Sequence, residues 1–179
     1  MLFSANLLTN PGFETGTSSG WTTDVGSLQV RSYTVRTGSY SLGYGDNTYQ
    51  ASQVVDISAY ATNIDAGLVT ADLYTWKSFS GASEGDTWRV RLQYLNAANG
   101  VLAEYDSGVV STPNTTYVQI QDIRVCPTNT RKLKIVLYGS EGGATNSDVY
   151  FDDCYAAISV DTFLKQYRRT RYPGSITGV

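Results

Sequence analysis

Residues 88–94 read Trp-Arg-Val-Arg-Leu-Gln-Tyr and alternate strictly between apolar and polar side chains. Successive side chains of a β-strand point to opposite faces, so this pattern predicts a strand with one buried face, and Trp88 in the core. A turn rich in Asn and Gly follows at Asn96–Gly100, and a second β-rich run covers Val101–Tyr105. These residues predict a β-hairpin, the basic unit of an antiparallel sheet.

The rest of the first 160 residues shows the same organisation. Gly, Asn, Asp, Ser and Pro separate short runs with strand character, and only Ser58–Ile64 suits a helix. The further runs are Tyr49–Ile57, Leu68–Phe79, Tyr117–Val125, Leu133–Leu137 and Val149–Ile158. About eight to ten strands without βαβ spacing predict an all-β fold, an antiparallel β-sandwich of the jelly-roll type over residues 1–160, with first and last strands adjacent.

Composition excludes several classes of function. The 179 residues suit one domain, and the chain contains no His. A Ser-His-Asp triad, a Cys-His pair and His-ligated zinc or haem are therefore excluded. No apolar run reaches the about 18 residues of a membrane span, so we expect no membrane partner. A net charge of −3 gives no general attraction to nucleic acid, which is not expected as a partner.

Charge separates a body from a C-terminal arm. Residues 1–160 hold 9 basic and 15 acidic side chains, whereas residues 161–179 hold 4 basic and 1 acidic. We expect the arm to dock on an acidic surface of a neighbouring protein, such as a second copy of the body. The alternatives are a frayed end, or an arm folded back on its own sandwich. Its expected partner-binding residues are aromatic, apolar or basic: Phe163, Leu164, Lys165, Tyr167, Arg168, Arg169, Arg171 and Tyr172.

Three stretches resemble landmarks of jelly-roll, galactose-binding-like carbohydrate-binding modules. Residues 6–21 contain Asn-Pro-Gly-Phe-Glu followed by Gly-Trp, residues 37–42 read Thr-Gly-Ser-Tyr-Ser-Leu, and residues 150–155 read Tyr-Phe-Asp-Asp-Cys-Tyr. In order, these stretches span most of the body. The resemblance implies the jelly-roll fold, and a scaffold that also occurs in phage virion components.

The resemblance also implies a structural calcium ion (Ca2+) where the first and last strands meet. Glu14, Asp152 and Asp153 are its expected ligands, since calcium takes several oxygen ligands. The alternative is that Glu14 caps backbone N–H groups while the two aspartates face water.

Sugar-binding sandwiches stack exposed aromatic rings on sugars beside polar groups. The candidate residues for such a face are an aromatic pair on one strand and a polar row on another: Tyr74, Trp76, Arg89, Arg91 and Gln93. Trp76 is equally compatible with a place in the core.

Acidic pairs and cysteines give no catalytic motif. Two acidic pairs, Glu84 with Asp86 and Glu104 with Asp106, lie in or beside turns. Because loop carboxylates are usually solvated, we expect the protein to have no enzymatic activity. Cys126 and Cys154 are more compatible with free buried thiols than with a disulfide, although sequence alone cannot place them.

Three functions remain, of which the least favoured is a hydrolase that would use the acidic pairs named above. The first is a virion structural protein, such as a phage decoration, collar or tail-associated subunit made in the host cytoplasm, because the sequence opens without a secretory signal and has an arm. The second is a carbohydrate-binding module of a secreted or surface protein. Copies of the protein itself or other virion proteins are the expected partners, and host-surface glycans are a further candidate.

Overall fold

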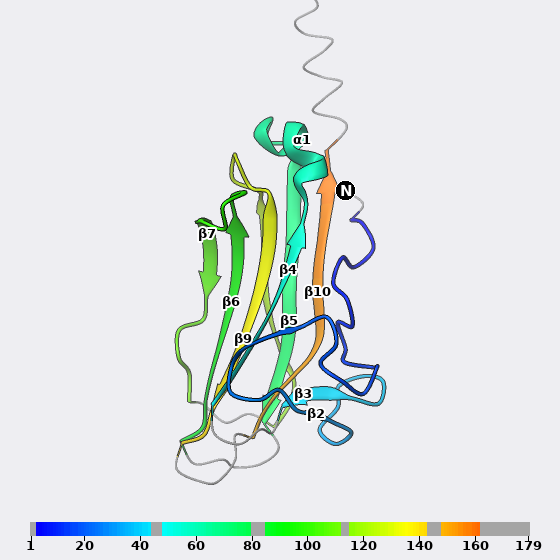
Figure 1. Ribbon diagram of the computed structural model, residues 1–179, viewed down its shortest axis with the longest axis vertical. Helices are drawn as coiled ribbons and strands as arrows, with labels where there is room; N and C mark the ends of the chain where they lie inside the picture. Colours follow the sequence, from blue (N-terminus) through cyan, green and yellow to red (C-terminus); the bar gives the residue numbers. More distant parts are fainter. Residues whose placement is uncertain (1–2, 44–47, 80–84, 112–114, 143–147, 162–179) are drawn as a thin grey trace, which may run out of the picture.

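The computed structural model in Figure 1 is a sandwich of two antiparallel sheets, as the strand pattern predicts. It describes residues 3–43, 48–79, 85–111, 115–142 and 148–161. Sheet A has the strand order β1-β4-β9-β6-β7, and sheet B has the order β2-β3-β10-β5-β8. The last strand ends at Val160, and residues 162–179 of the expected arm lie outside the described residues.

The elements follow the expected runs closely. Sheet A contains β1 (Thr22–Val25), β4 (Tyr49–Asp56), β6 (Thr87–Leu95), β7 (Val101–Asp106) and β9 (Lys132–Ser140). Sheet B contains β2 (Val30–Arg31), β3 (Ser41–Gly43), β5 (Val69–Phe79), β8 (Val118–Val125) and β10 (Val149–Val160). The helix-compatible stretch forms η1 (Ser58–Tyr60) and α1 (Ala61–Asp65) at one end of the sandwich (Figure 1).

The expected adjacency of the first and last strands needs a correction. The first strand, β1, pairs with β4 in sheet A, whereas β10 lies in sheet B. The segment beside β10 is the irregular N-terminal stretch, in which Ser4 N donates to Ile158 O (2.7 Å) and Leu7 N donates to Ala156 O (2.8 Å). Phe13 and Trp21 end this stretch by packing their rings together, with centroids 5.3 Å apart, in the core.

The core lies between the sheets and is filled by the inward side chains of the alternating strands. Trp88, Val90, Leu92 and Tyr94 are all buried, which confirms the predicted face of β6. One cation shares this interior: the Lys77 ammonium lies 4.7 Å from the ring centroid of Trp88 and 4.8 Å from that of Phe79. Burial lowers the pKa of Lys77, and the two aromatic rings offer the ammonium a cation–π contact.

Both cysteines are free and buried, as expected. Burial raises the pKa of the Cys126 thiol to about 12, and it raises that of Cys154 as well. Cys154 Sγ lies 3.2 Å from Thr75 Oγ1 inside sheet B. The two thiols are therefore protonated core groups rather than nucleophiles.

β10 contains a β-bulge that decides what faces outward from sheet B. Asp152 lies opposite Trp76 and Tyr155 lies opposite Tyr74, so two residues of β10 stand against one of β5 between these pairs. The extra residue, Asp153, has φ +45°, in the left-handed region that Asp tolerates better than most side chains.

Around this bulge three carboxylates hold the loop at residues 36–40, an arrangement called the carboxylate junction below. Glu14 accepts hydrogen bonds from the backbone N–H groups of Ser39 (2.9 Å) and Tyr40 (3.1 Å). Asp152 accepts from Arg36 N (2.9 Å) and Thr37 N (3.3 Å).

Gly38 is required where the loop passes Glu14. Its φ is +70°, and a Cβ there would lie 2.4 Å from the Glu14 carboxyl carbon. A larger residue would break the contact by which Glu14 caps this loop.

The junction predicts a pH dependence of stability. Asp152 is fully buried, and desolvation, with the nearby charge of Asp153, raises its pKa to about 6. In the unfolded chain the pKa returns to about 3.9. The folded state therefore binds the proton more tightly, and this contribution to stability is present below pH 4 and lost as the pH rises through 6. We expect the free energy of unfolding, measured by urea titration in EDTA, to fall by on the order of 2 kcal/mol between pH 4 and pH 7.5.

The Asp152→Asn variant should flatten this slope, although it should also be less stable at every pH because its amide replaces one accepting oxygen. Asp106→Asn is the control: the ion pair with Arg89 lowers the pKa of Asp106 to about 2, so its titration lies below this pH range. An unchanged slope in Asp152→Asn would assign the pH dependence elsewhere.

Candidate functional site

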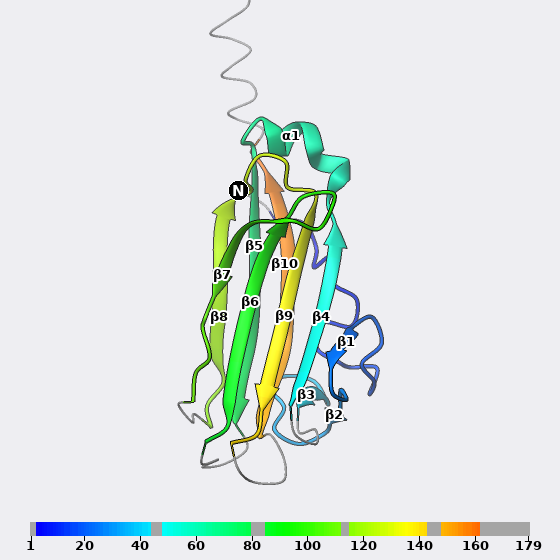
Figure 2. The ribbon, with the colours of Figure 1, turned by 60° about the vertical axis from the view of Figure 1, so that its left-hand side comes forward.

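The outer face of sheet A is an open surface floored by apolar and small side chains. Figure 2 shows β6, β9 and β4 side by side at the front of the sandwich, with the middle of the face uncovered by other described elements. Val136 and Ser52 point outward here, yet they are only 1% and 3% exposed. Their burial shows that longer neighbouring side chains stand around them.

Those longer side chains form rows across the strands. Gln50, Tyr138 and Arg89 are cross-strand neighbours in one row, and Val54, Lys134 and Gln93 form another. Arg91 lies between the rows, opposite Val136 on β9 and Asp106 on β7. We call this set the sheet A site.

Some polar groups of the sheet A site already have partners. Arg89 forms an ion pair with Asp106, Gln93 Nε2 donates to Glu104 Oε2 (2.9 Å), and Gln50 Nε2 donates to Asp24 Oδ2 (3.2 Å). Within the described part of the chain, Arg91, Lys134 and the Tyr138 hydroxyl have no hydrogen-bond or ion-pair partner.

A pocket of about 280 Å³ lies at one end of this face. It is lined by Val54, Gln93, Leu95, Asn99, Val101 and Lys134. The pocket and the unpartnered donors therefore lie on one continuous surface, with Lys134 belonging to both.

The predicted sugar-face residues divide between two faces. Arg89, Arg91 and Gln93 lie in the sheet A site, as a row on one strand face. Tyr74 and Trp76 lie on the outer face of sheet B, on the other side of the sandwich. Tyr138 and Lys134 were missed: the alternation of β9 puts them on the polar face of their strand, but only the pairing of β9 with β6 places them beside Arg91.

The outer face of sheet B carries an aromatic cluster. Tyr74 and Tyr155 stack with ring centroids 4.7 Å apart and planes inclined by 14°. The Arg36 guanidinium lies 3.8 Å from the ring centroid of Trp76, so Trp76 is a surface residue covered by a cation rather than part of the core. Burial and the neighbouring Tyr155 raise the pKa of Tyr74, which keeps its hydroxyl protonated.

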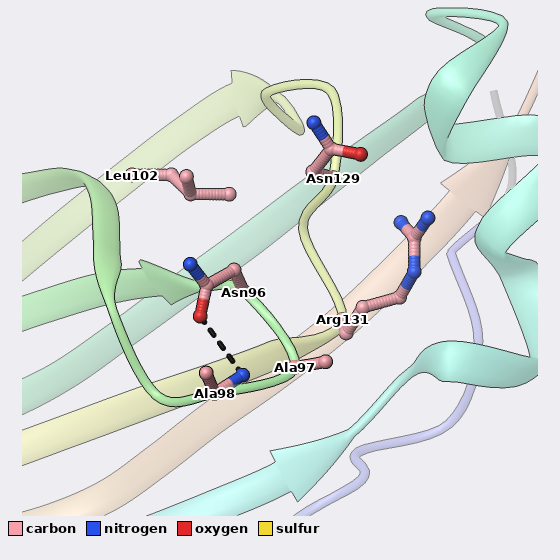
Figure 3. Close-up of a pocket in the computed structure, with 6 residues that line it drawn as sticks. All are labelled: Asn96, Ala97, Ala98, Leu102, Asn129 and Arg131. Carbon is pink, nitrogen blue, oxygen red and sulfur yellow. Dashed lines mark hydrogen bonds between the residues drawn. The ribbon is translucent and has the colours of Figure 1, made fainter.

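A second hollow lies at the end of the β6–β7 hairpin (Figure 3) and has a volume of about 410 Å³. Its polar side chains serve the local turns: Asn96 Oδ1 accepts from Ala98 N (2.9 Å), and Arg131 forms an ion pair with Asp65. None of its six lining residues, Asn96, Ala97, Ala98, Leu102, Asn129 and Arg131, is aromatic.

The acidic residues have structural partners. Asp86 is buried and accepts from Gly142 N (2.9 Å) and Asp148 N (2.6 Å), which ties two loops together. The hydrogen-bonded ion pair with Arg89 lowers the pKa of Asp106 to about 2. Asp106 is therefore ionised at neutral pH and is unsuited to act as a general acid. Glu84 lies outside the described residues.

The expected calcium ligands meet, but they contact protein donors. A Cβ on Gly12 would lie 3.5 Å from an oxygen of Asp152 and 3.5 Å from one of Asp153, which places both carboxylates around this turn. Asp153 is bonded to Arg36 Nη1 (2.5 Å) and Thr37 Oγ1 (2.8 Å). A calcium ion would have to displace Arg36 from Asp153. In the described ranges, no group of three or more His, Cys, Asp or Glu side chains is arranged to hold a metal ion.

The expected partner-binding residues of the arm, between Phe163 and Tyr172, lie outside the described residues. In the part of the chain that the structure describes, no helix has the length and apolar character needed to cross a membrane.

Solved structures share this fold. A family 16 carbohydrate-binding module has a TM-score of 0.59 and 16% identity, and the match covers 84% of this chain and 99% of the module. The Stig cyclase Fisc from Fischerella sp. TAU has a TM-score of 0.61 and 15% identity, with 89% and 100% covered.

The enzymatically active domain of tailspike protein 4 from bacteriophage CBA120 has a TM-score of 0.61 and 13% identity; the match covers 86% of this chain, which spans about a fifth (21%) of that protein. No protein-family model matches the chain, and no curated protein matches its sequence. At these identities the likeness concerns the fold: the chain has the jelly-roll β-sandwich of carbohydrate-binding modules.

Proposed function

We propose that the protein is a non-enzymatic carbohydrate-binding module whose ligand lies on the outer face of sheet A. The observation that carries this proposal is the set of unpartnered donors, Arg91, Lys134 and the Tyr138 hydroxyl, around the buried floor at Val136. Glycans present many hydroxyl groups, so a face with unused donors and amides beside an aromatic ring suits them. The shared fold with the family 16 module supports the assignment.

The charges of the sheet A site favour an acidic glycan. Asp106 lies opposite Arg91 and interacts with its charge, but both Asp106 oxygens are hydrogen-bonded to Arg89, so Arg91 forms no direct ion pair. Lys134 lies diagonally across from Arg91 on the next strand, at a spacing where long side chains can reach one group. Two neighbouring cations without a direct ion pair suit the carboxylate of a uronic acid, and Arg can hold that carboxylate through two hydrogen bonds.

Arg91→Ala and Lys134→Ala should each weaken binding of oligogalacturonate, measured by calorimetry, by about tenfold, because each removes a charge-assisted hydrogen bond. Binding should also weaken as the salt concentration rises. Arg124→Ala is the matched control, since Arg124 is paired with Asp122 on β8 of the opposite sheet. Equal affinity of all three variants and the native protein would rule out this site, and a glycan array without any bound sugar would rule out the function.

A virion role is the second candidate, and the match to a bacteriophage tailspike favours it. In this reading the module is a tail-associated or decoration subunit that the arm anchors to an acidic virion protein or to another copy. The last described residue, Asp161, donates its N–H to Leu68 O (2.8 Å) and lies at the end of the sandwich that carries α1 (Figure 1).

Truncation after Asp161 tests the arm. The melting temperature should change little, because the described sheets remain complete, while self-association measured by light scattering should be lost. The full-length association should weaken with salt, since the arm is basic and the body acidic. A truncated body that unfolds, or that associates as before, would show that the arm is not an assembly element.

A structural calcium ion at the carboxylate junction remains a proposal drawn from the resemblance. If Glu14, Asp152 and Asp153 hold calcium, EDTA should lower the melting temperature by several degrees, and excess calcium should restore it, because a ligand of the folded state stabilises it. Magnesium is the control, because it requires near-ideal octahedral coordination, which these three carboxylates are poorly arranged to provide. A melting temperature indifferent to EDTA and calcium would leave Arg36 as the cation of the junction.

A further inference from the structure

We infer that the outer face of sheet B carries a second sugar site, a pocket for one neutral pyranose ring against Tyr74 and Tyr155. The inference goes beyond the sheet A site, because it concerns the opposite face of the sandwich and different chemistry. It rests on a pocket, a stacked aromatic pair and unused hydrogen-bond donors that occur together.

The pocket has a volume of about 270 Å³ and lies where three parts of the chain meet. β5 and β10 supply Tyr74 and Tyr155, the N-terminal stretch supplies Asn6 and Pro11, and the loop after β2 supplies Arg36 and Thr37; Asp153 and Cys154 complete the lining. The volume is just below the roughly 300–1,000 Å³ of pockets that enclose drug-sized ligands, so the pocket suits a single ring rather than a chain.

The tyrosine pair forms a fixed wall of this pocket. Its two rings are cross-strand neighbours that stack on each other, and Tyr155 is held further by a hydrogen bond from its hydroxyl to Ser4 O (3.3 Å). An aromatic ring that is already immobilised loses little conformational entropy when a ligand packs on it. The apolar C–H face of a pyranose is a suitable partner for such a ring.

The polar groups of the pocket divide into occupied and available ones. The Asn6 amide is largely used, since its oxygen accepts from Leu8 N and Ala156 N (both 3.1 Å) and one of its two N–H groups donates to Cys154 O (2.9 Å). The Tyr74 hydroxyl has no hydrogen-bond partner within the described residues. Arg36 uses one terminal nitrogen for Asp153, which leaves further guanidinium N–H groups to donate.

Charge makes the expected ligand neutral. The Arg36 cation is already balanced by Asp153 and rests on Trp76, so the pocket holds no surplus charge of either sign. Its remaining donors and the adjacent carboxylate oxygens suit hydroxyl groups, which both donate and accept. This contrasts with Arg91 and Lys134 on the opposite face, which form no direct ion pair within the described residues.

The test uses methyl glycosides of galactose, glucose, mannose and xylose as probes on the full-length protein in EDTA buffer. Protein-observed NMR with labelled tyrosine rings should show saturable shifts of Tyr74 and Tyr155 with at least one probe, at a millimolar dissociation constant. Tyr74→Ala should weaken that binding at least about tenfold, and Tyr74→Phe, which keeps the ring, about threefold. Tyr60→Ala, which alters a part-exposed tyrosine on η1, is the control and should bind like the native protein.

The outcomes separate this inference from the proposed function. If Arg91→Ala removes oligogalacturonate binding and leaves the monosaccharide shifts at Tyr74 intact, the two sites are independent, as inferred. If no probe shifts the Tyr74 and Tyr155 rings, or if folded Tyr74→Ala binds the probe as tightly as the native protein, the second site is wrong, whatever the sheet A site does. Loss of the oligogalacturonate site alone would leave the second site standing.

Discussion

One extra residue in β10 is the constraint on which the carboxylate junction and the aromatic cluster both depend. Without the bulge at Asp153, strict alternation after Asp152 would turn Cys154 outward and Tyr155 inward. With it, the small Cys154 thiol enters the core against Thr75, and the large Tyr155 ring reaches the surface beside Tyr74. The bulge therefore decides which of two neighbouring side chains is buried: the small Cys154 thiol lies in the core, and the larger Tyr155 ring lies on the outer face.

The same bulge brings two carboxylates together, and the loop at residues 36–40 compensates for them. Asp152 is removed from water and receives backbone N–H groups, whereas Asp153 receives the guanidinium of Arg36. Arg36 is then directed over Trp76. A buried carboxylate is costly unless it is hydrogen-bonded, so the loop is held in place by the requirement to satisfy Asp152. The geometry of the sheet B pocket follows from this requirement.

The sequence allowed the regular part of the fold to be predicted, because period two in runs such as residues 88–94 depends on local pattern alone. The prediction failed where this two-residue alternation is interrupted. Nothing local in Tyr150–Tyr155 shows that Asp153 is an extra residue, so the sequence could not decide that Tyr155 faces Tyr74. The place of Trp76 depended on Arg36, which is 40 residues away in the chain. The candidate sugar residues were identified by type, but assigning them to faces required the strand order.

The two faces of the sandwich differ because their registers place charges differently. On sheet A, Asp106 lies directly opposite Arg91 but is hydrogen-bonded to Arg89, so Arg91 forms no direct ion pair. On sheet B, Arg36 arrives from a loop and is positioned by the carboxylate with which it forms an ion pair. Of these two arginines, only Arg91 keeps its guanidinium N–H groups free for a ligand carboxylate within the described residues. Only every second residue of each strand is needed for the core, so the outward-facing residues can vary without loss of the fold. The same jelly roll accordingly occurs in proteins as different as a binding module, a cyclase and a tailspike. Function in this chain must therefore be sought in the alternate residues that face outward, where substitutions leave the core packing intact.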